Sequence, residues 1–377
     1  MKILIDARMY GLEHSGIGRY IINLTEELKN IKSSDRYVIL LRKKYYNELK
    51  FSENWKKILV DVSHYTFREQ LELPFILYKE KPDLVHFPHF NIPIFWNGNF
   101  VVTIHDMTMH KQGVDATTQI FPLYIFKRLP YKFVFNTAVN KSKMIITPSD
   151  AVKKEVVDYY KVSTEKVRVI YEGFEEIFFQ EKMHTGGMEL LTKFGLSIFN
   201  YFIYVGNAYP HKNLSVVIKA IKKLNEGNGL NCFFAIAGSR NRFVERTEKL
   251  ILKECAQKYV KILGYVTDYE LKMLYRNSLA FIYPSLSEGF GLQGLEAMAA
   301  GTLIAASDIP VFREIYKDNA QYFDPNDDNS VINIMNNIVK MKNDERLIKI
   351  DKAKEYIKIY SWRKMAEETL EVYKKCR

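Results

Sequence analysis

The chain has 377 residues, of which 47% are hydrophobic and 26% are charged. This length and composition predict a globular protein of two domains and exclude a disordered chain, a collagen or a coiled coil as the main architecture. The 55 Lys and Arg residues exceed the 44 Asp and Glu residues, which gives a formal net charge of +11. This basic excess suits nucleic acid, an anionic membrane surface or a phosphate-bearing substrate, and the charge alone leaves all three open.

The cysteines and the N-terminal residues indicate the compartment. The three cysteines form no CxxC pair, so the sequence predicts neither a disulfide framework nor a zinc site. The first apolar run meets Asp6 after three residues, which is too soon for a signal peptide, and no run reaches the ~18 apolar residues of a membrane span. We expect a cytoplasmic protein, with any contact at the inner face of the membrane being peripheral.

The N-terminal half alternates short apolar runs with stretches of helical period. Strands are predicted at 3–5, 38–41, 84–86, 101–104 and 144–147. Helices are predicted at 19–30, 68–79, 121–141 and 151–160. Strands that alternate with helices in this way are typical of a doubly wound parallel sheet.

The alternation pauses over residues 172–200, which carry several glycines, and then restarts. Strands are predicted at 201–206, 232–237, 261–263, 279–283 and 303–306, with helices at 214–224, 242–257, 268–275, 292–300 and from about 330 to the end. We therefore predict two Rossmann-like α/β domains that face each other across a cleft, at 1–180 and 181–359. The last helix, about 360–377, can pack back on the first domain.

The densest chemical signal is segment 284–301, PSLSEGFGLQGLEAMAAG, which leads from a predicted buried strand into a helix. Its glycines allow a ligand to approach the backbone, and the amides of Phe290, Gly291 and Leu292 suit a diphosphate. Glu288 and Glu296 lie roughly 7–8 Å apart along the helix axis. Carboxylates suit hydroxyl groups on either side of a diphosphate, as in a nucleotide sugar. For each glutamate alone, an ordinary surface or helix acid is the alternative.

This segment resembles the E-x7-E block of retaining glycosyltransferases of the GT-B fold, in the residues EGFGLQGLEAMAAG. The similarity is to family 4, which includes bacterial mannosyltransferases and O-antigen or lipopolysaccharide glycosyltransferases, and it extends along the chain. It implies that Glu288 holds the donor sugar and Glu296 the ribose. It also implies that sugar and phosphate are bound by the amides of Gly289, Phe290, Gly291 and Leu292. Gln293 stands where the family often has proline.

The second segment, YVGNAYPHKNL at 204–214, places Lys212 between a strand and a helix. A cation there can stabilise the charge that grows on the departing β-phosphate. The resembled family commonly has arginine where this chain has Asn207, so the phosphate contact rests more on Lys212. The chain has no DxD pair, and the resemblance implies a reaction without a metal or another cofactor. A solvated lysine at a helix start is the alternative.

Three further segments match the family. Gly16 and Gly18, in SGIGRY, correspond to a family loop that approaches the donor phosphates, and a simple tight turn is the alternative. Because no third glycine follows, the segment does not match a dinucleotide-binding fingerprint. His105, in the pair HD, is implied to lie near the donor sugar, and a satisfied histidine followed by an N-cap is the alternative. The loop of Tyr265 and Val266 corresponds to a family loop that contacts the nucleobase. The alternative is that this segment only forms the start of the next helix.

The pattern as a whole predicts a retaining, metal-independent hexosyltransferase, whose domain 1–180 binds the acceptor and whose domain 181–359 binds the nucleotide sugar. His86 and His89 lack a third ligand, so no metal is expected. The favoured donor is GDP-mannose, and the favoured acceptor is a glycan or a polyprenyl-diphosphate-linked oligosaccharide of bacterial surface polysaccharide, such as O-antigen, lipopolysaccharide or capsule. A UDP-hexose donor and a non-hydrolysing sugar-nucleotide epimerase stay open.

A third alternative is a catalytically silent protein that binds a sugar nucleotide or nucleic acid; we expect no nucleic-acid partner.

The basic, aromatic segment 121–143 suits an anionic membrane or the lipid-linked acceptor. Its cations are Lys127, Arg128, Lys132, Lys141 and Lys143. A plain basic helix is the alternative.

Overall fold

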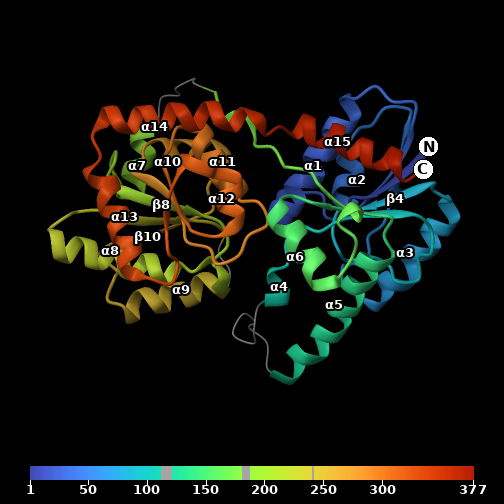
Figure 1. Cartoon of the computed structure of the whole chain (residues 1–377), viewed down its shortest axis with the longest axis horizontal. Coiled ribbons are helices and arrows are strands. Elements are labelled where there is room, and N and C mark those ends of the chain that lie inside the picture. Colours follow the sequence, from blue (N-terminus) through green and yellow to red (C-terminus); the bar gives the residue numbers. More distant parts are fainter. Residues whose placement is uncertain (112–120, 181–186, 240–241) are drawn as a thin grey trace. The chain divides into compact units, whose positions relative to one another are not determined.

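The computed structural model describes residues 1–111, 121–180, 187–239 and 242–377. The chain forms two compact units, which are unit 1, Met1–Gly173 with Tyr360–Arg377, and unit 2, Phe174–Ile359. Each unit contains one parallel sheet with helices on both faces (Figure 1). The predicted α/β class, with two doubly wound parallel sheets, is therefore confirmed.

Unit 1 has a seven-stranded sheet in the order β3-β2-β1-β4-β5-β6-β7. Every neighbouring pair runs parallel, as in Ile3 opposite Tyr37 on one side and Leu84 on the other. The strand order reverses direction between β1 and β4, which makes this edge the topological switch point of the sheet. The strands are β1 Lys2–Asp6, β2 Arg36–Leu41, β3 Trp55–Leu59, β4 Leu84–Phe87, β5 Phe100–Thr103, β6 Met144–Thr147 and β7 Val167–Val169.

The central strands of unit 1 are buried along their whole length, as the apolar runs predict. Among the helices of unit 1, α1 and α6 bury one apolar face each, whereas α2 buries no residue. They are α1 Ser15–Asn30, α2 Lys43–Glu48, α3 Phe67–Glu80, α4 Thr108–Lys111, α5 Phe121–Lys141, α6 Asp150–Tyr160 and α15 Trp362–Lys375.

The C-terminal helix α15 belongs to unit 1, where it packs against α1. Its Tyr373 hydroxyl lies 2.6 Å from Nδ1 of the buried His86, whose Nε2 lies 2.9 Å from the hydroxyl of Thr103. Burial lowers the pKa of His86 to about 3, so the ring is neutral and can accept at one nitrogen while it donates at the other. These bonds join α15 to two central strands of the sheet.

Unit 2 has a six-stranded sheet in the order β10-β9-β8-β11-β12-β13, with its switch point between β8 and β11. The strands are β8 Tyr201–Val205, β9 Phe233–Ala237, β10 Val260–Gly264, β11 Ala280–Tyr283, β12 Ile304–Ser307 and β13 Ala320–Phe323. The helices are α7 Gly187–Lys193, α8 Leu214–Asn228, α9 Arg242–Lys253, α10 Asp268–Arg276, α11 Leu292–Ala299, α12 Pro310–Tyr316, α13 Asp328–Lys340 and α14 Asn343–Tyr356.

Two predicted helices have different bounds in the structure. The helical region predicted from about 330 to the end consists of three helices, α13, α14 and α15, and the last of them agrees with the predicted helix at about 360–377. Helix α1 begins at Ser15 and not at residue 19, so its first turn includes the glycines of the predicted loop. None of the helices in the described part of the chain has both the length and the apolar content that a membrane span needs.

Candidate functional site

Two loops lie side by side at the carboxyl edge of the unit 2 sheet. One follows β8 and the other follows β11, and these strands are hydrogen-bonded neighbours at the switch point. The amide of Leu286 in the second loop donates to the carbonyl of His211 in the first, at 2.8 Å. Ligands of doubly wound sheets bind at this position. The fold therefore brings together the segments of Lys212 and Glu288, which are 76 residues apart in sequence.

Lys212 and Glu288 form the charged centre of this edge. Lys212 ends a short 3-10 turn, Pro210–Lys212, and its Nζ lies 2.5 Å from Oε1 of Glu288. The side chains are 16% and 12% exposed, so the pair is shielded from bulk water but not sealed from it. The Lys212 ammonium also lies 5.9 Å from the centre of the Tyr283 ring. A cation held in this way is positioned before a ligand arrives.

Two tyrosines lie beneath the ion pair. Tyr204 and Tyr283 are fully buried, and desolvation together with the charge of Glu288 raises their pKa well above 10. Both stay neutral phenols. The hydroxyl of Tyr204 donates to the carbonyl of Asn207 at 2.7 Å, and the hydroxyl of Tyr283 donates to the side-chain carbonyl of Gln293 at 2.8 Å. The pair of tyrosines thus fixes the start of one loop and the helix that follows the other.

Packing within the protein requires glycine at two positions of this segment, Gly291 before α11 and Gly294 within it. Gly291 lies at the N-cap of α11 with φ of 93°, a left-handed conformation that favours glycine. A Cβ there would lie 2.3 Å from the hydroxyl of Tyr316, and one at Gly294 would lie 2.2 Å from it. Tyr316 donates to the carbonyl of Gly291 at 2.5 Å. Close approach of Tyr316 thus explains these two glycines without a ligand.

The remaining predicted residues of this block lie where the loop becomes the helix. Glu288 and Gly289 precede α11, Leu292 is its first residue, and Glu296 is its fifth, as predicted. Glu296 is only 3% exposed, and Phe290 and Leu292 are also buried. Burial argues against an ordinary surface acid, because a carboxylate is rarely buried without a specific reason.

His105 lies in unit 1, at the carboxyl end of β5. Its Nδ1 lies 3.2 Å from a carboxylate oxygen of Glu172, and its Nε2 lies 2.9 Å from the carbonyl of Pro88. The edge of the Tyr20 ring contacts the imidazole, with centroids 4.9 Å apart. Glu172 and Pro88 thus fix the orientation of the imidazole at both nitrogens. The next residue, Asp106, accepts from the amide of Thr108 at the start of α4.

A buried charge network occupies the switch point of unit 1. The guanidinium of Arg8 donates to both oxygens of Asp6, at 2.8 and 2.7 Å, and to Glu69 of α3 at 2.7 Å. Asn91, in the loop after β4, donates to both oxygens of Glu69 at 2.9 Å. The side chain of Arg8 is 0% exposed. This network holds together the loops after β1 and β4 and the start of α3.

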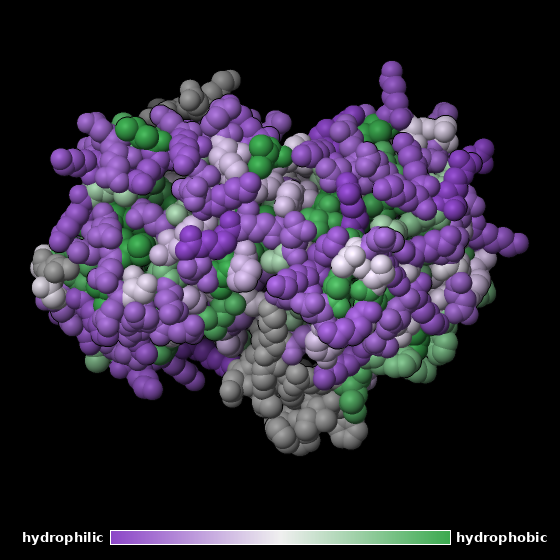
Figure 2. Space-filling view, viewed as in Figure 1, coloured by the Kyte–Doolittle hydropathy of each residue, from purple (hydrophilic) through white to green (hydrophobic). Residues whose placement is uncertain are grey.

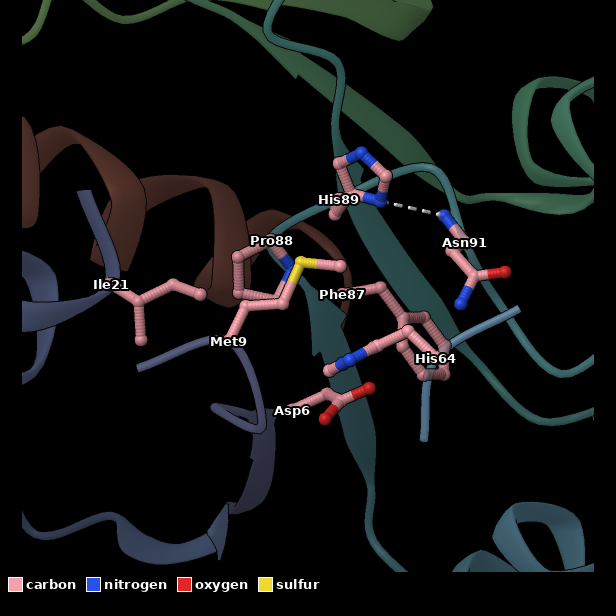
Figure 3. A pocket seen from close by; sticks show the side chains of 8 residues that line it. All are labelled: Asp6, Met9, Ile21, His64, Phe87, Pro88, His89 and Asn91. Atoms are coloured by element: carbon pink, nitrogen blue, oxygen red, sulfur yellow. Dashed lines mark hydrogen bonds between the residues drawn. The ribbon is translucent and has the colours of Figure 1, made fainter. Parts of the chain in front are cut away.

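A small pocket lies beside this network, and Figure 3 shows Asp6, His64, His89 and Asn91 around it. Its volume is about 10 Å³, enough for about one water molecule. Burial lowers the pKa of His64 to about 4 and that of His89 to about 3, so both rings are neutral at pH 7. Among the described residues, no group of three His, Cys, Asp or Glu is arranged to hold a metal ion.

Two family models match the chain. The model described as Glycosyl transferases group 1 matches residues 196–356, and the model described as Glycosyltransferase Family 4 matches residues 14–176. The first match spans all six strands of the unit 2 sheet, and the second spans the strands of unit 1 from β2 to β7. The chain is a glycosyltransferase with one domain of each of these two kinds.

Relatives and solved structures agree with this assignment. The glycosyltransferase is 26% identical to the O-antigen chain mannosyltransferase RfbU of Salmonella typhimurium, over 90% of this chain and 91% of that protein. It is 22% identical to the O-antigen chain mannosyltransferase B of Escherichia coli, over 99% and 100%. The structure of Anabaena Alr3699/HepE in complex with UDP and glucose matches with a TM-score of 0.77 and 15% identity, over 100% of both chains. The fold is thus GT-B.

The N-terminal glycines of the glycosyltransferase do not form a loop, contrary to expectation. Gly16 and Gly18 lie in the first turn of α1. A Cβ at Gly18 would lie 1.8 Å from the carbonyl oxygen of Gly11, so this glycine is required by the fold itself. Nothing lies within 4 Å of a Cβ built at the exposed Gly16.

The predicted nucleobase loop lies between β10 and α10. Tyr265 is 72% exposed and Val266 is half-buried. Thr267, which follows these two residues, is the N-cap of α10 and forms a capping box with Glu270. The predicted helix cap is therefore confirmed at Thr267.

Sequence analysis missed the Arg8 network of the glycosyltransferase. Its members Asp6, Arg8, Glu69 and Asn91 come from three separate segments, and each alone resembles an ordinary surface residue. The usable signal is the sequence DAR directly after a buried strand at the N-terminus, where charge at a switch point is expected to be functional or paired.

Proposed function

We propose that the glycosyltransferase is a retaining, metal-independent enzyme that moves mannose from GDP-mannose to a lipid-linked glycan in bacterial surface polysaccharide synthesis. The observation that carries the proposal is the Lys212–Glu288 pair at the switch point of unit 2, 2.5 Å apart and partly shielded. Support for mannose and for O-antigen comes from the names of the relatives in Salmonella and Escherichia. An α-(1→4)-mannosyltransferase of Mycolicibacterium hassiacum, 24% identical over 61% of this chain, adds to it.

The proposed chemistry uses Lys212 as a fixed cation. The bond between the sugar's anomeric carbon and the β-phosphate oxygen breaks, and negative charge grows on that phosphate. An ammonium already held by Glu288 can stabilise this charge without reorganising. The acceptor oxygen bonds to the same face of the anomeric carbon, and its proton passes to the departing phosphate. Glu288 and Glu296 accept hydrogen bonds from sugar and ribose hydroxyls.

The remaining assigned roles are part of the same proposal. The backbone from Gly289 to Leu292 binds sugar and phosphate, and the loop of Asn207 borders the diphosphate. Tyr265 and Val266, exposed and half-buried after β10, meet the base. In unit 1, His105 is held by Glu172 and Pro88 for contact with the donor sugar. Gly16 leaves open space at the start of α1, which suits the approach of a phosphate.

Membrane contact through unit 1 is the part of the proposal that concerns the acceptor. Hydrophobic residues reach the surface over α3 and α5, at the lower right of Figure 2. Those exposed by about half or more are Phe67, Leu71, Phe75 and Tyr78 of α3, Leu129 and Phe133 of α5, and Phe95. Lys132 and Lys141 of α5 and the nearby Lys143 are exposed cations of the same region. The side chains of Lys127 and Arg128 lie outside the described residues. Apolar residues beside cations suit an anionic bilayer surface.

A thermal-shift panel of nucleoside diphosphates tests the donor. A ligand that binds the folded state raises the melting temperature, by an amount that grows with its concentration over Kd. We expect GDP to give a larger shift than UDP or ADP, and the same shift with and without EDTA. A larger shift with UDP would replace GDP-mannose by a UDP-hexose, and a shift that requires a divalent cation would contradict metal independence.

Product analysis tests the reaction. Radiolabelled GDP-mannose, incubated with membrane extract as the acceptor source, should label a lipid-extractable glycan, with an α-linkage if the enzyme is retaining. Turnover of the nucleotide sugar to an epimer without any acceptor would contradict transfer and support the epimerase.

A further inference from the structure

A second pocket of unit 1 lies at the carboxyl ends of β1, β2 and β3, beside the switch point. Its volume is about 310 Å³, within the ~300–1,000 Å³ of small-molecule sites. The residues that line it come from the loops after these three strands, from helix α2 and from the turn before α1. The argument uses Arg8, Glu13, Arg42, Lys44, Tyr45 and Asp61.

The pocket depends on a glycine in a backbone conformation that other residues rarely adopt. Gly11 has φ of 123°, in the region that favours glycine. A Cβ there would lie 2.1 Å from the hydroxyl of Tyr45 and 2.4 Å from a carboxylate oxygen of Glu13. The absent side chain thus lets Tyr45 and Glu13 meet at the pocket wall.

Donors and acceptors alternate around the wall. The Tyr45 hydroxyl donates to Glu13 at 2.6 Å and accepts from Lys44 at 2.8 Å. The ammonium of Lys44 lies 4.6 Å from the centre of the Tyr45 ring and 3.4 Å from the other oxygen of Glu13. Tyr45 therefore positions both charged groups.

The ion pairs of the pocket are long enough for a ligand to replace them. The Lys44–Glu13 and Arg42–Asp61 contacts are both 3.4 Å, beyond the ~2.7–3.2 Å of a strong hydrogen bond. All four side chains are at least one third exposed. Each therefore has hydrogen-bonding capacity that the hydroxyl groups of a ligand can use.

One donor of the pocket is buried. Arg8 lines the pocket with its side chain 0% exposed, and its Nη1 has no hydrogen-bond partner within the described part of the chain. An unpaired buried guanidinium nitrogen costs free energy, so a ligand that accepts from it gains affinity.

The charges of the wall balance. Two cations, Arg42 and Lys44, face two anions, Glu13 and Asp61, while Arg8 is already neutralised by Asp6 and Glu69. A phosphate at this wall would lie beside two carboxylates, which disfavours it. Vicinal hydroxyl groups both donate and accept, and they match alternating charges without adding any.

We propose that this pocket binds the uncharged pyranose ring of the acceptor, and so sets the sugar to which the hexose is transferred. The proposal rests on the proposed function, because it assigns unit 1 to the acceptor. It predicts that the acceptor ends in a neutral hexose or N-acetylhexosamine, and that a phosphate or carboxylate on that ring weakens binding.

Saturation-transfer NMR tests this directly. The probes are the methyl glycosides of mannose, glucose, galactose and N-acetylglucosamine, each mixed with the full chain and excess GDP. At least one glycoside should receive saturation from the protein. Tyr45→Phe should weaken the binding of that glycoside about tenfold, because the variant lacks the hydroxyl group that positions Glu13 and Lys44. Lys43→Ala, an exposed cation next to the pocket and outside its lining, is the matched control and should leave binding unchanged.

A charge swap gives the second arm. Asp61→Asn with Glu13→Gln leaves the wall with two uncompensated cations, so the glycoside should bind at least tenfold more weakly while mannose 6-phosphate binds more tightly than to the parent chain. The proposal is overturned if no glycoside receives saturation, if the control loses binding as Tyr45→Phe does, or if the parent chain prefers mannose 6-phosphate.

The outcomes separate this inference from the proposed function. If GDP still shifts the melting temperature and transfer to membrane extract proceeds in Tyr45→Phe with an unchanged acceptor KM, the pocket assignment fails and the transferase survives. If the parent chain shows neither nucleotide binding nor transfer, the proposed function itself fails.

Discussion

The two sheets place charge at the same topological position but bury it to different degrees. At the switch point of unit 1, the side chain of Arg8 is 0% exposed, and Asp6 and Glu69 are 8% and 1% exposed. At the switch point of unit 2, Lys212 and Glu288 are 16% and 12% exposed. A buried network mainly fixes loops and leaves only Nη1 of Arg8 for a ligand, whereas an ion pair that water can reach is able to meet a substrate with its charge.

This difference predicts that the two sites fail in different ways when they are changed. Removal of the buried cation should lower stability, and removal of the accessible cation should lower turnover. The predictions below test that separation.

The largest expected effect is on stability in unit 1. Arg8→Met should lower the free energy of unfolding by about 3–5 kcal/mol, because it leaves two buried carboxylates without their counter-charge. Urea unfolding followed by circular dichroism measures it. Arg313→Met is the matched control, since Arg313 makes a similar bidentate pair with Asp308 but is 52% exposed, and it should cost at most about 1 kcal/mol. Equal losses in both variants would contradict the role given to burial.

The second effect is on turnover in unit 2. Lys212→Ala should lower kcat by about 10²–10³, as the loss of one preorganised charge does, with a smaller loss of stability than in Arg8→Met because Glu288 is partly exposed. Steady-state kinetics with GDP-mannose measures the first quantity and urea unfolding the second. Lys223→Ala, an exposed cation of α8 that pairs with Asp328 at 3.2 Å, should leave kcat unchanged. Unaltered turnover in Lys212→Ala would remove Lys212 from the mechanism.

The third effect is the pH dependence of stability through His86. The pKa of His86 is about 3 in the folded chain and near its usual value of 6.5 when unfolded, so the unfolded state takes up the proton first as pH falls. Its stabilising contribution is complete above pH 6.5 and is lost as pH falls toward 3. About 2–3 kcal/mol should disappear between pH 6.5 and 4.5, at ~1.4 kcal/mol per pH unit.

His86→Gln isolates this contribution. Urea unfolding of the variant should give a shallower decline between pH 6.5 and 4.5, although His64 and His89, whose pKa values are also low, keep part of the slope. An identical slope in variant and parent would show that His86 is not the group that titrates.

Sequence analysis predicted all the central strands of the two sheets and, of the four edge strands, only β10. The strands that sequence analysis missed, β3, β7 and β13, all lie at sheet edges. Their sequences, WKKIL, VRV and AQYF, include polar or half-exposed residues, because one side of an edge strand meets water. Central strands such as β4 are buried throughout and read as apolar runs.

The site shows a similar limit. A contiguous segment predicted the loop before α11, since Glu288, Gly291 and Glu296 lie within nine residues. The causes of two of its glycines were not predictable, because they depend on Tyr316 of another helix. The Arg8 network and the 310 Å³ pocket join residues that are far apart in sequence, from Asp6 to Asn91, and only the folded sheet brings these together.

The smallest effect tests whether a buried residue of unit 2 can still serve the substrate. Glu296 is 3% exposed, close to the burial of Glu69 in unit 1, yet its proposed partner is the ribose. Glu296→Gln keeps the shape and removes the charge, so GDP should bind about tenfold to hundredfold more weakly, as expected for the loss of a hydrogen bond to a charged acceptor. Titration calorimetry with GDP measures this, and the exposed Glu345→Gln serves as control. If the variant loses stability but keeps its affinity for GDP, Glu296 has a structural role like that of the buried Asp6 and Glu69 in unit 1. Burial alone would then decide which charged groups at the two switch points can contact the donor.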